Sequence, residues 1–204
     1  MIYWRDEALV LSRGSFSETS IILKVFTKNY GIRSGMVRGG RNKKKIFIFE
    51  TGNKIFVEWK GRTEDMLGNF NCELTNANEA IYFNSPIKLS GIVSILNLIE
   101  FCLLENESES DLYNFTCKVI KKIIKQDNWF GEYVFWELLL LEKIGFGLQL
   151  ARCAVTGNKN NLLYLSPKTG NAISSHASGK WKSRLLKLPQ FLVSNSEPQK
   201  KDIL

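Results

Sequence analysis

The first 75 or so residues constrain the fold most, because they divide into five short runs with the composition of β-strands. Each run is rich in valine, isoleucine, phenylalanine or tryptophan, and turn-forming residues separate it from the next. We predict strands over 8–11, 20–27, 32–37, 54–59 and 66–74. In the fourth run Ile55, Val57 and Trp59 alternate with mostly charged residues, which predicts one buried and one more exposed face. Five such strands predict a small closed or partly closed barrel of the OB-fold type.

The remainder of the chain has helical periodicity. Ser85 and Pro86 form a typical helix start, and 87–104 is apolar nearly all round, which predicts a buried central helix. Further helices are expected over about 112–125 and 129–143, the second helix with a basic face. The predicted class is α+β, with a five-stranded OB-fold-like barrel at 1–78 and a mainly helical domain at 79–204. Beyond residue 150 we expect an irregular segment with a short strand at 162–165, a short helix at 184–188 and a frayed tail at 197–204.

Positive charge is concentrated in the predicted barrel. The formal net charge is +8, yet the segment from Lys24 to Arg62 alone holds eleven basic residues and only two acids, Glu50 and Glu58. Such a surface with interleaved aromatic rings is typical of nucleic-acid binding, with cations on phosphates and rings on bases. Phe26, Phe56 and Trp59 fit the core better, whereas a turn position makes Tyr30 the best candidate for an exposed ring. The candidate DNA-binding residues are Lys24, Lys28, Tyr30, Arg33, Arg38, Arg41, Lys43, Lys44, Lys45, Lys60 and Arg62.

No motif indicates catalysis, so we predict that the chain is not an enzyme. A hydrolase built on His176, Ser174 and Asp202 is the catalytic alternative, but the sequence has no Gly-x-Ser-x-Gly elbow and no phosphate-binding loop of the Walker type. Glu64 and Asp65 fit a hairpin turn better than a metal site. His176 fits a solvated loop.

The four cysteines form no Cys-x-x-Cys pair, which is typical of reduced thiols in a cytosolic protein. The first residues lack a secretory pattern, and the longest apolar run is too short to span a bilayer. We therefore expect a cytoplasmic protein with no membrane contact.

Several segments in the correct order resemble the RecO family of DNA repair proteins. Trp4 to Leu11 is similar to the first strand of that family, and Ser17-Glu18-Thr19-Ser20 resembles its Gly-Glu-x-Ser turn with Ser17 in place of glycine. The segment from Phe26 to Gly31, followed by Val37 to Arg41, resembles the family's FT…G…RGGR pattern. Trp136 to Leu148 looks like the helix before the family's cysteine loop, which would fall at about 150–180.

The resemblance implies a mediator that works by binding rather than by catalysis. RecO-like proteins bind single- and double-stranded DNA, anneal complementary strands and work with RecR. They contact the acidic C-terminal tail of single-strand-binding protein and so help RecA to load on gapped DNA, which makes RecA an indirect partner. It also implies a bacterial, nucleoid-associated location.

The cysteine loop departs from the family pattern. Many RecO proteins bind zinc through four loop cysteines, whereas only Cys153 stands here and Thr156 occupies its Cys-x-x-Cys partner position. We predict no zinc and no other cofactor. The C-terminus looks short for the family, and its last helix is expected to be abbreviated or missing.

The second predicted helix is the candidate site for the protein partner. The tail of single-strand-binding protein is acidic and ends in apolar residues, so its receptor should join an apolar groove to cations. The candidate partner-binding residues are Lys118, Lys121, Lys122 and Lys125 on that helix, with Arg152 and Lys180 from the cysteine-loop segment. A solvated basic face is the alternative for these lysines, and another OB-fold protein that binds RNA is the alternative for the whole chain.

Overall fold

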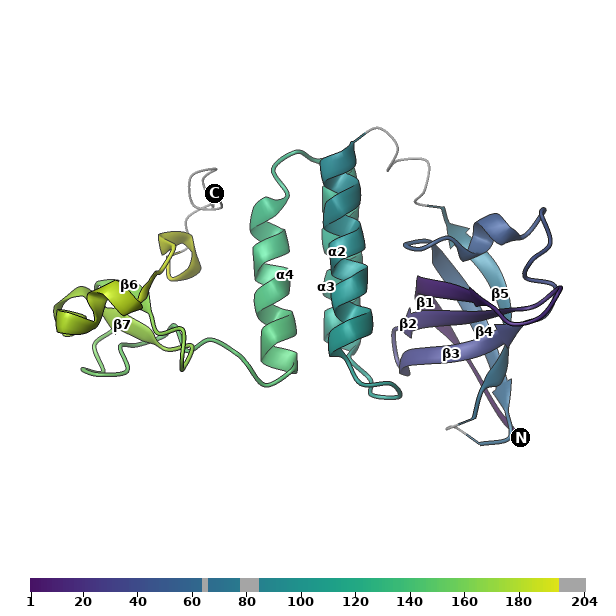
Figure 1. The fold of residues 1–204 in the computed structure, drawn as a ribbon, viewed down its shortest axis with the longest axis horizontal. Helices are drawn as coiled ribbons and strands as arrows, with labels where there is room; N and C mark the ends of the chain where they lie inside the picture. Colours follow the sequence, from purple (N-terminus) through teal and green to yellow (C-terminus); the bar gives the residue numbers. More distant parts are fainter. Residues whose placement is uncertain (64–65, 78–84, 195–204) are drawn as a thin grey trace. The chain divides into compact units, whose positions relative to one another are not determined.

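The computed structural model describes residues 1–63, 66–77 and 85–194, which fall into two compact units, Met1–Asp127 and Asn128–Leu204. The first unit holds a closed barrel and two helices (Figure 1). The second holds one helix and a small three-stranded sheet. Two expectations, a short link between domains at residues 78–84 and a tail at 197–204, lie outside the described residues.

The barrel has five strands in the order β1-β2-β3-β5-β4, which confirms the predicted OB-fold-like α+β class. The strands are β1 (Ile2–Ser15), β2 (Ile21–Thr27), β3 (Gly31–Val37), β4 (Lys54–Gly61) and β5 (Gly68–Asn76). β1 is longer than predicted because it pairs with β4 through its first half and with β2 through its second, across a register shift between Val10 and Ser12. A short parallel pairing of β3 with β5 closes the barrel.

Aromatic rings fill the barrel core, and glycines make room for them. Trp4 stacks on Trp59 with ring centroids 5.7 Å apart and meets Phe70 edge-on. A Cβ atom added at Gly68 would lie 2.2 Å from the Trp59 indole, so this β5 position admits only glycine without a shift of the ring. Ile55, Val57 and Trp59 are all buried, as their alternation predicts.

Two helices pack on the barrel within the first unit: α2 (Pro86–Cys102) and α3 (Ser110–Lys125). Tyr113 of α3 meets Phe26 of the barrel edge-on at 5.5 Å, and the Ser12 hydroxyl donates to Glu100 of α2 at 2.8 Å. The prediction that this segment forms a buried central helix holds for only one face of α2. Ile92, Ile95, Leu96 and Ile99 are buried, whereas Val93 is 38% exposed and Phe101 is 90% exposed.

The second unit begins with α4 (Phe130–Lys143) and continues into a sheet of order β7-β6-β8. Its strands are β6 (Leu162–Leu165), β7 (Ala172–Ser174) and β8 (Leu186–Lys187). Two 3-10 turns, Ser175–Ala177 and Gly179–Arg184, lie between β7 and β8, and a third, Gln190–Leu192, follows β8. The helix predicted at 184–188 is therefore wrong, since a 3-10 turn ends at Arg184 and a strand follows. The core of this sheet is small: Cys153, Leu162, Ala172, Ile173 and Leu188. Among the described residues no helix is long and apolar enough to cross a membrane.

Candidate nucleic-acid interface

A surface loop after β3, residues 38–45, carries five cations and is here called the basic loop. Main-chain bonds hold it in place: Gly40 N–H donates to Val37, and Arg41 N–H donates to Thr19 in the β1–β2 connection. Gly39 supplies a positive φ of 68° at the turn. The backbone of the loop is thus hydrogen-bonded internally. All five cationic side chains are exposed: Arg38, Arg41, Lys43, Lys44 and Lys45. The Arg41 guanidinium also donates to the Ser17 carbonyl at 3.0 Å.

Two further exposed cations, Lys60 and Arg62 at the end of β4, lie near the basic loop around a hollow of about 630 Å³. The floor of this barrel hollow is apolar, with Ile48, Phe49 and Phe70. Four cations line it, namely Arg38, Lys45, Lys60 and Arg62, and no carboxylate lines it among the described residues. The hollow therefore combines a positive rim with an apolar floor on one side of the barrel.

The two acids in the segment from Lys24 to Arg62, Glu50 and Glu58, contact residues other than the seven exposed cations. Glu50 forms an ion pair with Arg13. Glu58 accepts hydrogen bonds from Asn71 Nδ2 at 3.1 Å and from the Tyr3 hydroxyl at 3.0 Å, and these bonds lower the pKa of its carboxyl. Within the described residues, none of the seven exposed cations forms an ion pair, so their charge stays available to a ligand.

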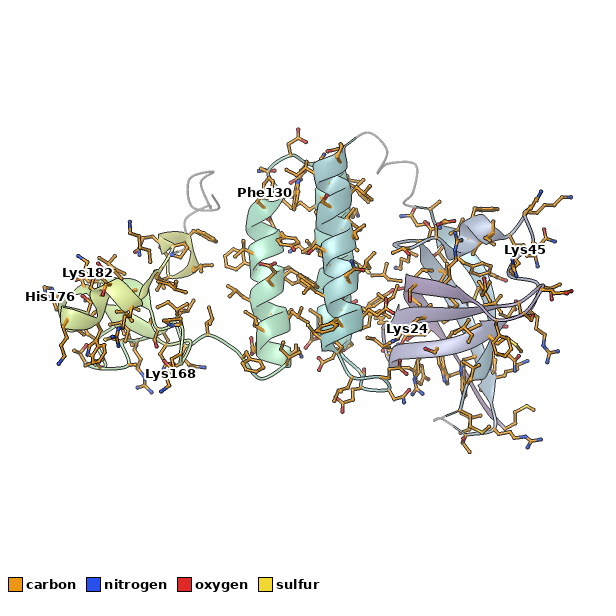
Figure 2. All side chains as sticks on the ribbon, in the orientation of Figure 1. Lys24, Lys45, Phe130, Lys168, His176 and Lys182 are labelled. Carbon is orange, nitrogen blue, oxygen red and sulfur yellow. The ribbon has the colours of Figure 1, made fainter. Side chains whose placement is uncertain are left out.

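Other predicted DNA-binding residues have internal roles. Lys24 Nζ lies 3.0 Å from Glu105 and 3.8 Å from Glu100, on the side of the barrel that faces α2, whereas Lys45 projects on the opposite side (Figure 2). Arg33 is only 6% exposed, its Nε donates to the Tyr30 carbonyl, and its guanidinium lies 5.8 Å from the Trp4 ring. Lys28 is half-buried at the β2–β3 turn.

Tyr30 does not present a free ring. It is half-buried, and Trp4 stacks on it with centroids 4.3 Å apart and planes 15° apart. Phe26 and Trp59 are core residues, as expected, and Phe56 is half-buried. The Tyr30 ring, which the sequence predicts to be exposed, is thus packed against Trp4 of the barrel.

The predicted partner-binding lysines of α3 lie beside a second hollow, of about 440 Å³, between α3 and the barrel. Lys121 and Lys125 line this α3 hollow together with apolar Leu9, Ile120 and Ile124. Lys118 is exposed outside it and Lys122 is half-buried. The other two predicted residues, Arg152 and Lys180, are exposed in the second unit, where Arg152 borders a hollow beside Cys153.

The described part of the second unit lacks a set of zinc ligands. Cys153 is buried and its sulfur accepts a hydrogen bond from the Ser174 N–H at 3.3 Å. Burial raises the pKa of this thiol, but hydrogen bonds from Ser174 and Thr156 outweigh that effect and lower the pKa to about 6. Among the described residues no three histidine, cysteine or carboxylate side chains gather around a point that could hold a metal. The absence of zinc stays a prediction.

The described residues do not form the serine–histidine pair that the hydrolase alternative requires. Ser174 is buried at 3% exposure, whereas His176 is exposed (Figure 2), and no hydrogen bond between them occurs in the described part of the chain. Asp202 lies outside the described residues.

Comparisons with known proteins agree over both parts of the chain. A family model described as "Recombination protein O N terminal" matches residues 1–77, and one described as "Recombination protein O C terminal" matches residues 84–203. A protein named "DNA repair protein RecO" from Dinoroseobacter shibae is 36% identical over 193 residues, which is 95% of this chain and 80% of that protein. Proteins of the same name from Roseobacter denitrificans and Mesorhizobium japonicum are each 36% identical, and cover 93% and 95% of this chain and 78% and 76% of their own length.

Proposed function

The chain belongs to the RecO family of DNA repair proteins, and from that premise we propose that it is a DNA-binding mediator of recombination that catalyses no reaction. It binds single- and double-stranded DNA through phosphates and anneals complementary strands. The observation that carries the proposal is the set of seven exposed cations that form no ion pair among the described residues, five in the basic loop and two at the end of β4, four of which line the barrel hollow.

The charge arrangement accounts for annealing. Two phosphate backbones repel each other, and a protein that neutralises phosphates lowers that repulsion while releasing condensed counterions. The basic loop supplies five cations on a short, internally bonded backbone, so they are held near one another before DNA arrives. Its contacts are to phosphates, so binding should be nearly independent of base sequence. Lys24 is left out of this surface because it is ion-paired with Glu100 and Glu105, and Arg33 because it is buried.

The α3 hollow is the proposed receptor for the tail of single-strand-binding protein. An acidic peptide that ends in apolar residues needs cations beside an apolar groove, and Lys121 and Lys125 flank Leu9, Ile120 and Ile124 in that way. Through this contact, and together with RecR, the chain helps RecA to load on gapped DNA. Arg152 and Lys180 belong to the second unit and are not part of the proposed tail receptor in the α3 hollow.

The test measures binding and annealing together. Arg38→Gln with Lys45→Gln should weaken binding to single-stranded and duplex DNA of any sequence and slow annealing in parallel. Lys118→Gln is the matched control, since it removes an exposed cation of the same unit outside the barrel hollow. DNA binding and annealing unchanged by the double variant would contradict the proposal. Competition in which RNA displaces DNA would favour the alternative of an RNA-binding OB-fold protein, because the 2′-hydroxyl permits such a preference.

A further inference from the structure

The sheet of the second unit has an unusual charge balance. Between Ile144 and Ser194 the chain has seven lysines and arginines and no aspartate or glutamate. Four of the seven fall within eight positions around the Gly179–Arg184 turn: Lys180, Lys182, Arg184 and Lys187. All four are exposed. Lys182 and Lys168 both project from this unit (Figure 2). The surface is therefore positive without a nearby carboxylate in sequence to neutralise it.

A tryptophan stands in the middle of this surface. Trp181 is 52% exposed, whereas each of the other four tryptophans is at most 5% exposed. The turn holds it outward: Trp181 N–H donates to the Ser178 carbonyl, and the Ser178 hydroxyl donates to the Ser175 carbonyl. Gly179, with a positive φ of 41°, lets the chain turn immediately before it. The indole therefore lies in water beside four exposed cations, where its ring is available to a ligand.

The cations are arranged on aromatic rings. Lys180 Nζ lies 5.5 Å and Arg184 Cζ 5.3 Å from the Trp181 ring centroid, and Lys182 Nζ lies 5.9 Å from the ring of Tyr164 in β6. These cation–π contacts restrict long, flexible side chains beside the indole before any ligand binds. A ring with two cations beside it matches the chemistry of a nucleotide, in which an aromatic base is linked to phosphates.

We propose that this Trp181 surface (Lys180, Trp181, Lys182 and Arg184) is a second nucleic-acid-binding site, in which Trp181 stacks on an unpaired base and the cations contact the flanking phosphates. Stacking on an aromatic ring requires an unstacked base, so the site takes single strands rather than duplex. An acidic protein segment would satisfy the cations as well, and the polyglutamate comparison below separates it from a single strand. The inference rests on the proposed function in DNA binding and adds a site to it on the other unit.

The five tryptophans make the site directly observable. Because only Trp181 is exposed, addition of an oligothymidylate to the full chain should quench mainly its emission, and the oligonucleotide should then protect it from acrylamide. In Trp181→Phe that part of the signal should be absent. Trp181→Ala should weaken single-strand binding about fivefold or more, as expected for loss of one stacked base, and leave duplex binding within about twofold. Phe146→Ala is the matched control, since it removes a ring of the same unit that is 71% exposed and lies outside the Gly179–Arg184 turn.

A charge-reversed barrel separates this site from the proposed function. In a variant with Arg38, Arg41 and Lys45 changed to Glu, oligothymidylate at higher concentration should still quench Trp181. If Trp181→Ala leaves single-strand affinity unchanged while the barrel variant lowers it, the second site is refuted and the proposed function stands. If neither variant lowers DNA binding, both are refuted. If polyglutamate quenches Trp181 and oligothymidylate does not, the surface binds acidic protein, and the inference is wrong.

Discussion

The barrel wall and the basic loop use the same side chains in opposite ways. On the wall, Lys24 forms ion pairs with Glu100 and Glu105, and Arg33 is buried against Trp4. In the loop, the five lysines and arginines are exposed and form no ion pair among the described residues. Each of these side chains adds one positive charge to the net charge, but only those of the loop leave that charge available to a ligand. The comparison predicts that wall variants change stability and that loop variants change DNA affinity.

The largest effect is expected in the loop. Arg38→Glu, Arg41→Glu and Lys45→Glu together should lower single-strand affinity at least about 100-fold near 0.1 M salt, since each lost phosphate contact costs about 0.7 decade there. The urea midpoint should change little because these side chains are exposed. Fluorescence anisotropy and urea unfolding of the same variant test both statements. A clearly lower urea midpoint would show that the loop side chains stabilise the fold, and would contradict the difference drawn between loop and wall.

The wall residue Arg33 should show the reverse pattern. Arg33→Ala removes its cation–π contact with Trp4 and leaves the Tyr30 carbonyl without this donor, so the free energy of unfolding should fall by about 2 kcal/mol. Urea unfolding measures the change. DNA affinity of the folded fraction should stay within about twofold. A large loss of DNA affinity with an unchanged free energy of unfolding would show that Arg33 contacts DNA.

The α3 hollow extends the comparison to a third surface. Lys121→Glu with Lys125→Glu should weaken binding of an acidic tail peptide about tenfold, from about 0.7 kcal/mol for each exposed pair, and leave DNA affinity nearly unchanged. Calorimetry with the peptide and anisotropy with DNA give the two affinities. Lys118→Glu is the control outside the hollow. Equal losses for peptide and DNA would show one shared basic face instead of two sites.

The smallest effect is expected at Lys24. Lys24→Met keeps the aliphatic stem and removes partly exposed ion pairs, so it should cost at most about 1 kcal/mol and change DNA affinity less than twofold. Thermal unfolding and anisotropy are sensitive enough to bound both values. An affinity loss as large as that of a loop lysine would remove the distinction between wall and loop.

The sequence predicts the architecture well because its signals are local. Alternation in Ile55, Val57 and Trp59 and the turn formers between runs locate the five strands of the barrel. The N-terminal half of β1 is missed, since Arg5, Asp6 and Glu7 have low strand propensity. In the structure the buried Asp6 carboxylate accepts hydrogen bonds from the N–H and side-chain amide of Asn29, a pairing 23 positions away.

The candidate site is predicted only in part, because pairing of charges is a tertiary property. Nothing in the local sequence distinguishes Arg33, which contacts Trp4, from Arg38, which is exposed. Tyr30 is misplaced for the same reason, since its partner Trp4 is remote in sequence. Of the Trp181 surface only Lys180 is among the candidate residues, as a partner-binding residue, although the seven cations without an acid over 144–194 can be counted in the sequence. Exposure of its tryptophan is visible only in the structure.

The salt dependence of single-strand binding tests the central claim most directly. If the five cations of the basic loop each contact a phosphate, log K should fall with log salt with a contribution to the slope of about −3.5, from about 0.7 per contact. We predict that a variant with all five changed to Gln loses that contribution and is equally weakened on every base sequence. Binding that is indifferent to salt, or a slope that the five substitutions leave unchanged, would contradict the assignment of DNA binding to the loop.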